Sequence, residues 1–215
     1  MTLVAVGDSI VHAEDSWAAW LARAMDRPLR RVSADGARAD DVLDQLGSST
    51  GERYAVACLS VGTNDVLFDW DATEFARRLG EIAQVLRGSA EHVVVPTVSL
   101  SLARFPGGGA GFRHRVGDAN AALLASGLTV IAGDDLGGSR LQQPDRIHPT
   151  TEGQLLLADR AAAALGVTTV PSSLTGRPQR ADRWTYHRVG AGQAPRRAVK
   201  RILGRPIYRV PRLGG

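Results

Sequence analysis

The stretch TLVAVGDSI, residues 2–10, decides the fold that we expect for this chain. Its first five residues form an apolar run, as strands that are buried on both faces do, and the run leads directly into Gly-Asp-Ser. Similar, nearly continuous apolar runs recur further along the sequence. They predict five strands, at 2–6, 29–32, 55–61, 92–98 and 128–132.

Segments of helical periodicity lie between and after these strands. They predict helices over 15–25, 39–46, 72–86, 112–125 and 150–165. Asp71 and Glu74 are typical residues for the start of the third helix. Five strand–helix units with short connections predict an α/β fold, a three-layer α/β/α sandwich with a five-stranded, mostly parallel sheet.

The composition indicates one globular domain. The chain has 215 residues, of which 44% are hydrophobic and 22% charged. Its single cysteine, Cys58, excludes an internal disulfide framework and a thiolate zinc cluster. No apolar run approaches the ~20 residues of a membrane-spanning helix. Because the first residues lack the basic region and cleavage site of a secretory leader, we expect a cytoplasmic protein.

The net charge of +4 conceals two parts of opposite sign. Residues 171–215 contain ten Arg and one Lys against one acidic residue, which gives +10. Residues 1–170 contain the other 15 basic and 21 acidic residues, which gives −6. We therefore predict a folded domain at 1–170 and a basic, Arg-rich C-terminal tail at 171–215, in which 171–183 is a linker.

Three roles for this tail remain open. Residues 195–203 can form a short basic amphipathic helix. The tail could dock on the acidic body of the same or a neighbouring subunit, which is the favoured role. It could instead hold the protein at an anionic membrane surface, as a peripheral protein. Nucleic-acid binding through Trp184, Tyr186 and Tyr208 among the arginines is the least favoured role.

Residues with catalytic chemistry follow four of the five predicted strands. Ser9 follows the first, Gly36 the second and Asn64 the third, and Asp145 and His148 come between the fifth strand and the last helix. In a parallel sheet, ligands bind beyond the carboxyl ends of the strands. We therefore expect these residues to meet at one edge of the sheet.

Each of these residue types suits acyl transfer. A serine hydroxyl becomes nucleophilic when an imidazole accepts its proton, and a carboxylate orients that imidazole. Of the five histidines, His148 alone has an aspartate three residues earlier, Asp145. The Ser9 and Gly36 N–H groups and the Asn64 amide could stabilise the oxyanion that forms.

Four motifs together resemble the SGNH (GDSL-type) hydrolase family: GDSI at 7–10, the glycine after the second strand, GTND at 62–65 and DRIHP at 145–149. The resemblance spans roughly residues 1–165. It implies a flavodoxin-like fold and hydrolysis of esters, thioesters or acyl groups on sugars and lipids, without metal or cofactor. It places the family's named residues on Ser9, Gly36, Asn64 and His148, with Asp145 as the triad acid. The glycine lacks the Asn that often precedes it.

Other candidates have simpler interpretations. The glycine-dense segment 105–114 predicts a mobile wall of the substrate pocket, with Phe105, Gly107, Gly108 and His114 as substrate-binding residues, or else a flexible surface loop. Asp8 is expected to hold the turn, and Asp65 to support Asn64. The aspartate pairs of the sequence lack a histidine or third acid, so we expect no metal site.

The sequence therefore predicts a serine hydrolase of small, lipid-like or O-acetyl-carbohydrate esters. Two alternatives remain open. An acyltransferase would use the same triad, and a non-catalytic module of the same fold would be recruited to anionic surfaces by its basic tail.

Overall fold

The computed structural model describes residues 1–47, 51–68, 70–104 and 109–175. A five-stranded sheet, with strand order β2-β1-β3-β4-β5, forms its centre, and every adjacent pair of strands is parallel. The strands are β1 (Thr2–Gly7), β2 (Leu29–Arg31), β3 (Tyr54–Ser60), β4 (Ala90–Pro96) and β5 (Thr129–Ile131). Because all strands run the same way, their carboxyl ends share one edge of the sheet.

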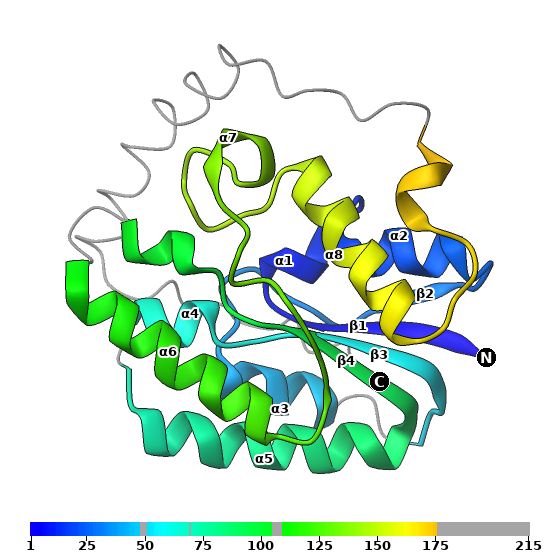
Figure 1. Cartoon of the computed structure of the whole chain (residues 1–215). Coiled ribbons are helices and arrows are strands. Elements are labelled where there is room, and N and C mark those ends of the chain that lie inside the picture. The colour runs from blue at the N-terminus through cyan, green and yellow to red at the C-terminus, as the bar shows by residue number, and fades with distance from the viewer. Residues whose placement is uncertain (48–50, 69, 105–108, 176–215) are drawn as a thin grey trace.

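Helices cover both faces of this sheet (Figure 1). On one face lie α2 (Trp17–Ala24) and α8 (Thr151–Ala164), and on the other lie α3 (Ala39–Gly47), α5 (Ala72–Ser89) and α6 (Gly109–Ala125). Each face of the sheet packs its own apolar cluster against these helices. The three-layer α/β/α prediction is confirmed.

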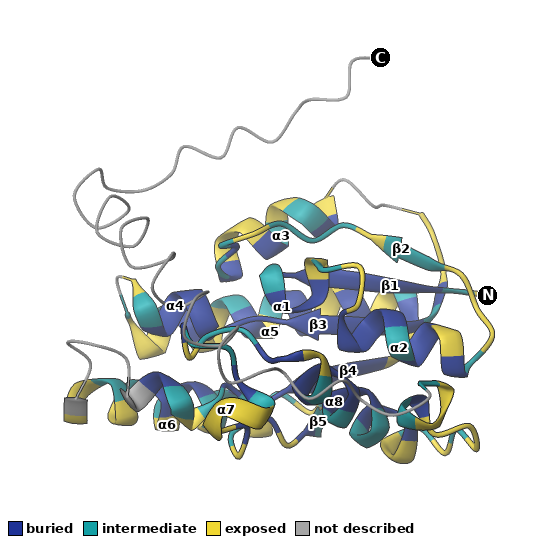
Figure 2. Ribbon diagram, turned by 90° about the horizontal axis from the view of Figure 1, so that it is seen from above, coloured by how far each residue is buried: buried dark blue, intermediate teal, exposed yellow. Residues whose placement is uncertain are grey.

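The central strands are buried and β2 is not (Figure 2). Residues 3–7 of β1 are all buried, as the opening apolar run predicts. The second predicted strand, at 29–32, was wrongly grouped with the buried strands. It contains Arg30 and Arg31, lies at the edge of the sheet, and pairs Arg30 with Glu52 in a salt bridge. An edge strand has a neighbouring strand on one side only, so it can carry charged residues.

Several short helices were not predicted. They are α1 (Ser9–His12), α4 (Thr63–Leu67), α7 (Gly138–Leu141) and the 3-10 helices η1 (Leu100–Arg104) and η2 (Pro171–Leu174). Each has only four or five residues, too few for a helical period to show in the sequence. Two of them, α1 and α4, begin next to predicted site residues.

The folded body extends beyond the predicted boundary at 170. Pro171 is buried, and the backbone N–H of Ser172 donates a hydrogen bond of 2.8 Å to the Asp159 carboxylate of α8. The linker prediction is therefore wrong for Pro171–Leu174. The predictions for residues 176–215 of the tail lie outside the described residues, as do those for Phe105, Gly107 and Gly108.

Among the residues that the structure describes, no helix has the length and apolar character needed to cross a membrane.

Side-chain caps fix where the helices begin. Asp71 accepts hydrogen bonds from the N–H groups of Thr73 and Glu74, as predicted for the start of α5. Thr150 caps α8 by accepting from the N–H of Gly153, so Pro149 lies before the cap rather than inside the first turn. The cap sets the position at which the loop carrying His148 joins α8.

Gly153 is required by a close backbone contact. A Cβ atom at this position would lie 2.2 Å from the carbonyl oxygen of Leu141. At Gly80, on the exposed side of α5, a Cβ atom would meet nothing within 4 Å. We predict that Gly153→Ala lowers the free energy of unfolding by about 2 kcal/mol or more, because the backbone must move. Gly80→Ala should raise it by about 0.5–1 kcal/mol, since alanine favours a helix.

Urea unfolding followed by circular dichroism measures both variants. A Gly153→Ala protein as stable as the Gly80→Ala protein would contradict this interpretation of the contact.

Candidate active site

Ser9 lies at the first turn after β1, where the chain changes direction sharply. Gly7 has a φ of +125°, and a Cβ atom there would lie 1.9 Å from the carbonyl oxygen of Ser60 on β3. Only glycine permits this approach. Asp8 then caps α1, because its Oδ1 accepts a hydrogen bond of 3.0 Å from the N–H of Ile10. Ser9 is thereby held as the first residue of α1.

The Ser9 hydroxyl meets His148, as predicted. Ser9 Oγ lies 2.8 Å from His148 Nε2, and His148 Nδ1 lies 2.7 Å from Asp145 Oδ2. An ionised carboxylate only accepts hydrogen bonds, so Nδ1 carries the proton and Nε2 of the neutral ring is left to accept from Ser9. The three residues therefore form a directed chain of hydrogen bonds from hydroxyl to carboxylate.

The loop of residues 142–150 is built around the Asp145 carboxylate. Its Oδ1 accepts the N–H groups of Ile147 at 2.9 Å and of His148 at 3.0 Å, while its Oδ2 bonds the imidazole. Asp145 is 4% exposed. With both oxygens occupied, this carboxylate fixes the backbone and the ring of His148 at once.

The electrostatics of this pair favour its charged form. Burial acts to raise the pKa of Asp145, but the hydrogen bonds and charge of His148 outweigh burial and hold that pKa below its usual value. Burial acts to lower the pKa of His148, but the hydrogen bond to Asp145 and the charges of Asp145, Asp8 and Asp35 outweigh it and raise that pKa. The site therefore makes His148 a stronger base than a free imidazole.

Asp8 is a second carboxylate beneath the site. It is fully buried and accepts a hydrogen bond of 2.7 Å from the Ser60 hydroxyl. Burial raises the pKa of Asp8 to about 6, against the lowering effect of hydrogen bonds from Ser60 and Ile10. These bonds attach the Ser9 turn to the end of β3, which is the turn-holding role expected of Asp8.

Asn64 and Gly36 lie on the loops that follow β3 and β2. Asn64 is in α4, and its Nδ2 donates a hydrogen bond of 3.0 Å to the carbonyl of Ala37. Gly36 has a φ of +77° in the turn closed by the Ala37 N–H on the Ala34 carbonyl. Ala34 in turn donates to Gly7 at the end of β1. Hydrogen bonds thus join the ends of β1, β2 and β3 around Ser9.

Two predicted residues have other partners than expected. Asp65 Oδ1 accepts the N–H of Ala39 at 3.0 Å, so Asp65 holds the start of α3 rather than the side chain of Asn64. His114 lies in α6, not in a loop, because the helix already begins at Gly109. The His114 side chain is 82% exposed and pairs with Asp118 one turn later. The pocket wall predicted at 105–114 is therefore helical from residue 109 onward.

Ser99 and Ser101, which follow β4, were missed in the sequence and hold the loop that carries His148. Ser101 Oγ donates a hydrogen bond of 2.8 Å to the carbonyl of Arg146. Gln142 Nε2 donates one of 3.1 Å to Ser99 Oγ. Their position after β4 was a usable signal, because ligands bind beyond the carboxyl ends of parallel strands.

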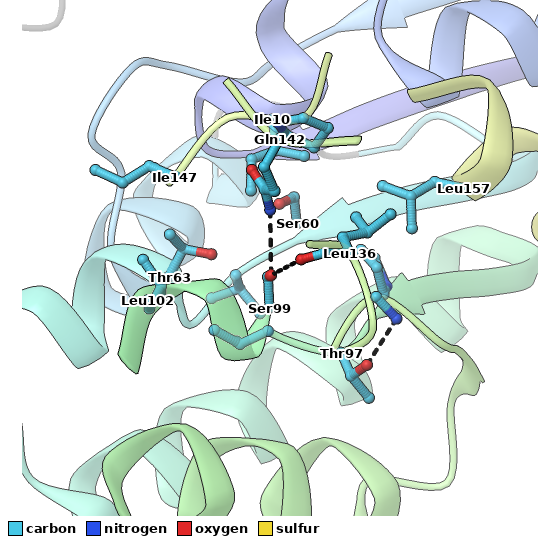
Figure 3. Close-up of a pocket in the computed structure, with 15 residues that line it drawn as sticks. Ile10, Ser60, Thr63, Thr97, Ser99, Leu102, Leu136, Gln142, Ile147 and Leu157 are labelled. Carbon is cyan, nitrogen blue, oxygen red and sulfur yellow. Dashed lines mark hydrogen bonds between the residues drawn. The ribbon is translucent and has the colours of Figure 1, made fainter. Parts of the chain in front are cut away.

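A small cavity lies at the carboxyl ends of β3, β4 and β5 (Figure 3). Three of its wall residues are sequence neighbours of the site: Ile10 follows Ser9, Thr63 precedes Asn64, and Ile147 precedes His148. The full lining comprises Ile10, Ser60, Val61, Thr63, Pro96, Thr97, Val98, Ser99, Leu102, Gly133, Leu136, Gln142, Ile147, Pro149 and Leu157. Sequence neighbours of three predicted site residues therefore line a small, largely apolar cavity.

The part of the chain that the structure describes holds no group of three or more His, Cys, Asp or Glu side chains arranged to bind a metal ion.

Comparison with known proteins decides the family. The model of the GDSL-like lipase/acylhydrolase family matches residues 5–156, which is more than half of the chain. The chain belongs to this family. The prediction of an SGNH (GDSL-type) esterase or lipase, a carboxylic ester hydrolase, is therefore confirmed. No curated protein sequence matches the chain.

Solved structures of GDSL-type proteins share the fold. A lipolytic protein of the G-D-S-L family from Desulfitobacterium hafniense has a TM-score of 0.62 at 15% identity, covering 76% of this chain and 98% of its own. TesA has a TM-score of 0.60 at 22% identity, covering 77% and 98%. A variant of Axe2, an acetyl xylan esterase from Geobacillus stearothermophilus, has a TM-score of 0.57 at 15% identity, covering 77% and 94%.

The charge pairing at this GDSL-type site predicts the titration of His148. Its imidazole should titrate above the ordinary histidine value of 6.5, because Asp145 stabilises the protonated ring. In Asp145→Asn the pKa of His148 should fall, because the neutral asparagine no longer stabilises the protonated ring, whereas burial still lowers the pKa. NMR of the imidazole resonances against pH measures both values. Titration of wild-type His148 below 6.5 would contradict the expected pairing.

Proposed function

We propose that this GDSL-family protein hydrolyses carboxylic esters through a Ser9–His148–Asp145 triad and a covalent acyl-enzyme. The observation that carries the proposal is the continuous hydrogen-bond chain from the Ser9 hydroxyl through His148 to Asp145. Such a chain matches the geometry that activates a serine nucleophile.

The reaction follows from where the protons lie. As Ser9 Oγ attacks the acyl carbon, its proton moves to His148 Nε2, and Asp145 stabilises the imidazolium that forms. His148 then gives this proton to the departing alkoxide, which leaves as the alcohol. Water takes the alcohol's place, loses a proton to His148 and cleaves the acyl–Ser9 bond. The acid is released and the Ser9 hydroxyl is restored.

The oxyanion of each tetrahedral intermediate needs donors already aimed at it. We assign this role to the N–H groups of Ser9 and Gly36 and to the Asn64 side chain. The Asn64 amide has two N–H bonds, and the bond to the Ala37 carbonyl uses one of them. That bond orients the amide and leaves its second N–H for the substrate.

We propose small or lipid-like esters as substrates, with O-acetyl groups of carbohydrates as the closest variant. Support for the second class comes from the fold shared with the acetyl xylan esterase. The His148 side chain is 35% exposed, so the side of the site from which the alcohol leaves is open to solvent. An open side accommodates a bulky alcohol such as a sugar.

Ser9→Ala tests the nucleophile. The variant should lose at least ~10³-fold in the rate of p-nitrophenyl acetate hydrolysis while its circular dichroism stays unchanged, because the acyl-enzyme cannot form. Ser139→Ala, which removes an exposed serine on α7, is the matched control and should hydrolyse the ester like the wild type. A fluorophosphonate should label the wild type on the peptide that contains Ser9. Equal hydrolysis by wild type and Ser9→Ala would refute the mechanism.

Asn64→Ala tests the oxyanion donor. Its kcat for p-nitrophenyl acetate should fall by about 10²–10³, with KM nearly unchanged, since the lost hydrogen bond forms in the transition state. Thermal unfolding of the variant controls for loss of the bond to Ala37. A folded variant with wild-type kcat would remove Asn64 from the oxyanion hole.

A further inference from the structure

The cavity at the carboxyl ends of β3, β4 and β5 combines apolar walls with one buried amide. Val98, Leu102, Leu136 and Leu157 contribute aliphatic side chains, and Gln142 lies among them at 2% exposure. Figure 3 shows Gln142 facing Ser99 across this space, with a hydrogen bond between them. The polar atoms of a buried glutamine side chain almost always have hydrogen-bond partners. A polar atom of Gln142 that lacks a partner therefore indicates what kind of group binds there.

Counting protons fixes the orientation of this amide. Ser99 Oγ carries one proton. The Oγ atom lies 2.7 Å from the carbonyl oxygen of Leu136, which can only accept a hydrogen bond. That proton is therefore donated to Leu136, and Ser99 must accept from Gln142. The amide thus turns its nitrogen to Ser99 at 3.1 Å. Its oxygen, Oε1, has no hydrogen-bond partner among the described residues.

A buried acceptor without a partner costs free energy until a donor reaches it. The cavity has a volume of about 20 Å³, room for one group the size of a water molecule. A long acyl chain cannot enter this cavity unless its walls move. A short substrate segment that ends in a hydroxyl would fill the space and supply the missing donor.

We propose that the acyl group bound at Ser9 is a short hydroxyacyl group, and that its hydroxyl enters this cavity, where Gln142 Oε1 accepts a hydrogen bond from it. This inference rests on the ester hydrolysis proposed above. The acyl group is assigned to the cavity because the other side of the site, where the His148 side chain is partly exposed to solvent, is assigned to the departing alcohol. Gln142 is then a specificity-determining residue.

Paired esters with a common leaving group test this subsite. They are p-nitrophenyl propionate against lactate, and p-nitrophenyl butyrate against 3-hydroxybutyrate. The wild type should favour the hydroxyacyl member of at least one pair by about three- to tenfold in kcat/KM, the range of one net hydrogen bond. Gln142→Met, which keeps the length of the side chain and removes the acceptor, should abolish that preference.

Ser101→Ala is the matched control, because it removes the bond from Ser101 Oγ to the Arg146 carbonyl, which holds the loop that carries His148, but keeps the Gln142–Ser99 bond that orients Oε1. It should lower hydrolysis of both members of a pair together and keep their ratio, as would any general loosening of the loop that carries His148. The ratio therefore reports recognition rather than stability.

Two results would overturn the subsite and leave ester hydrolysis intact: equal kcat/KM within both pairs for the wild type, or an unchanged preference in Gln142→Met. The first would show that Oε1 bonds a resident water instead. Failure of the wild type to hydrolyse any of the four esters, together with no fluorophosphonate labelling of Ser9, would instead refute the proposed function.

Discussion

The hydrogen bond between the Ser9 hydroxyl and the His148 imidazole joins residues that are 139 positions apart in the sequence. It forms because β1 ends in a turn that only glycine at position 7 permits, and because Asp145 folds the loop that carries His148 around its own carboxylate. Ser9 and His148 are thus both held in place by the backbone that carries them. A serine and an imidazole held in this way need little reorganisation before a proton passes between them.

The buried carboxylates of Asp145, Asp8 and Asp65 have different roles. Asp145 has both oxygens occupied by donors, and its pairing with His148 favours the ionised form. Asp8 and Asp65 each leave one oxygen without a partner among the described residues, and burial raises the pKa of both. Asp8 fixes the turn that carries Ser9, and Asp65 fixes the start of α3.

The sequence predicted the sheet well because buried parallel strands are apolar along their whole length, as 2–6 and 55–61 are. It failed at 29–32, where charged residues form an edge strand, and at short helices such as α1 and α4. A strand's place in the sheet is set by its neighbours, and a single helical turn has too few residues to show a period. The glycine-dense segment 105–114 was also misleading, because α6 already begins at Gly109 and continues through Gly111.

The sequence by itself determined the family, the order of the strands along the chain and the candidate residues for acyl transfer, because these depend on residue type and local spacing. Only the tertiary structure decided that Ser9 and His148 lie at hydrogen-bond distance and that Asp65 bonds α3. It also decided that Ser99 and Gln142 meet beside the site. These contacts join segments far apart in the chain, and their distances follow from how the sheet and its two helical layers pack.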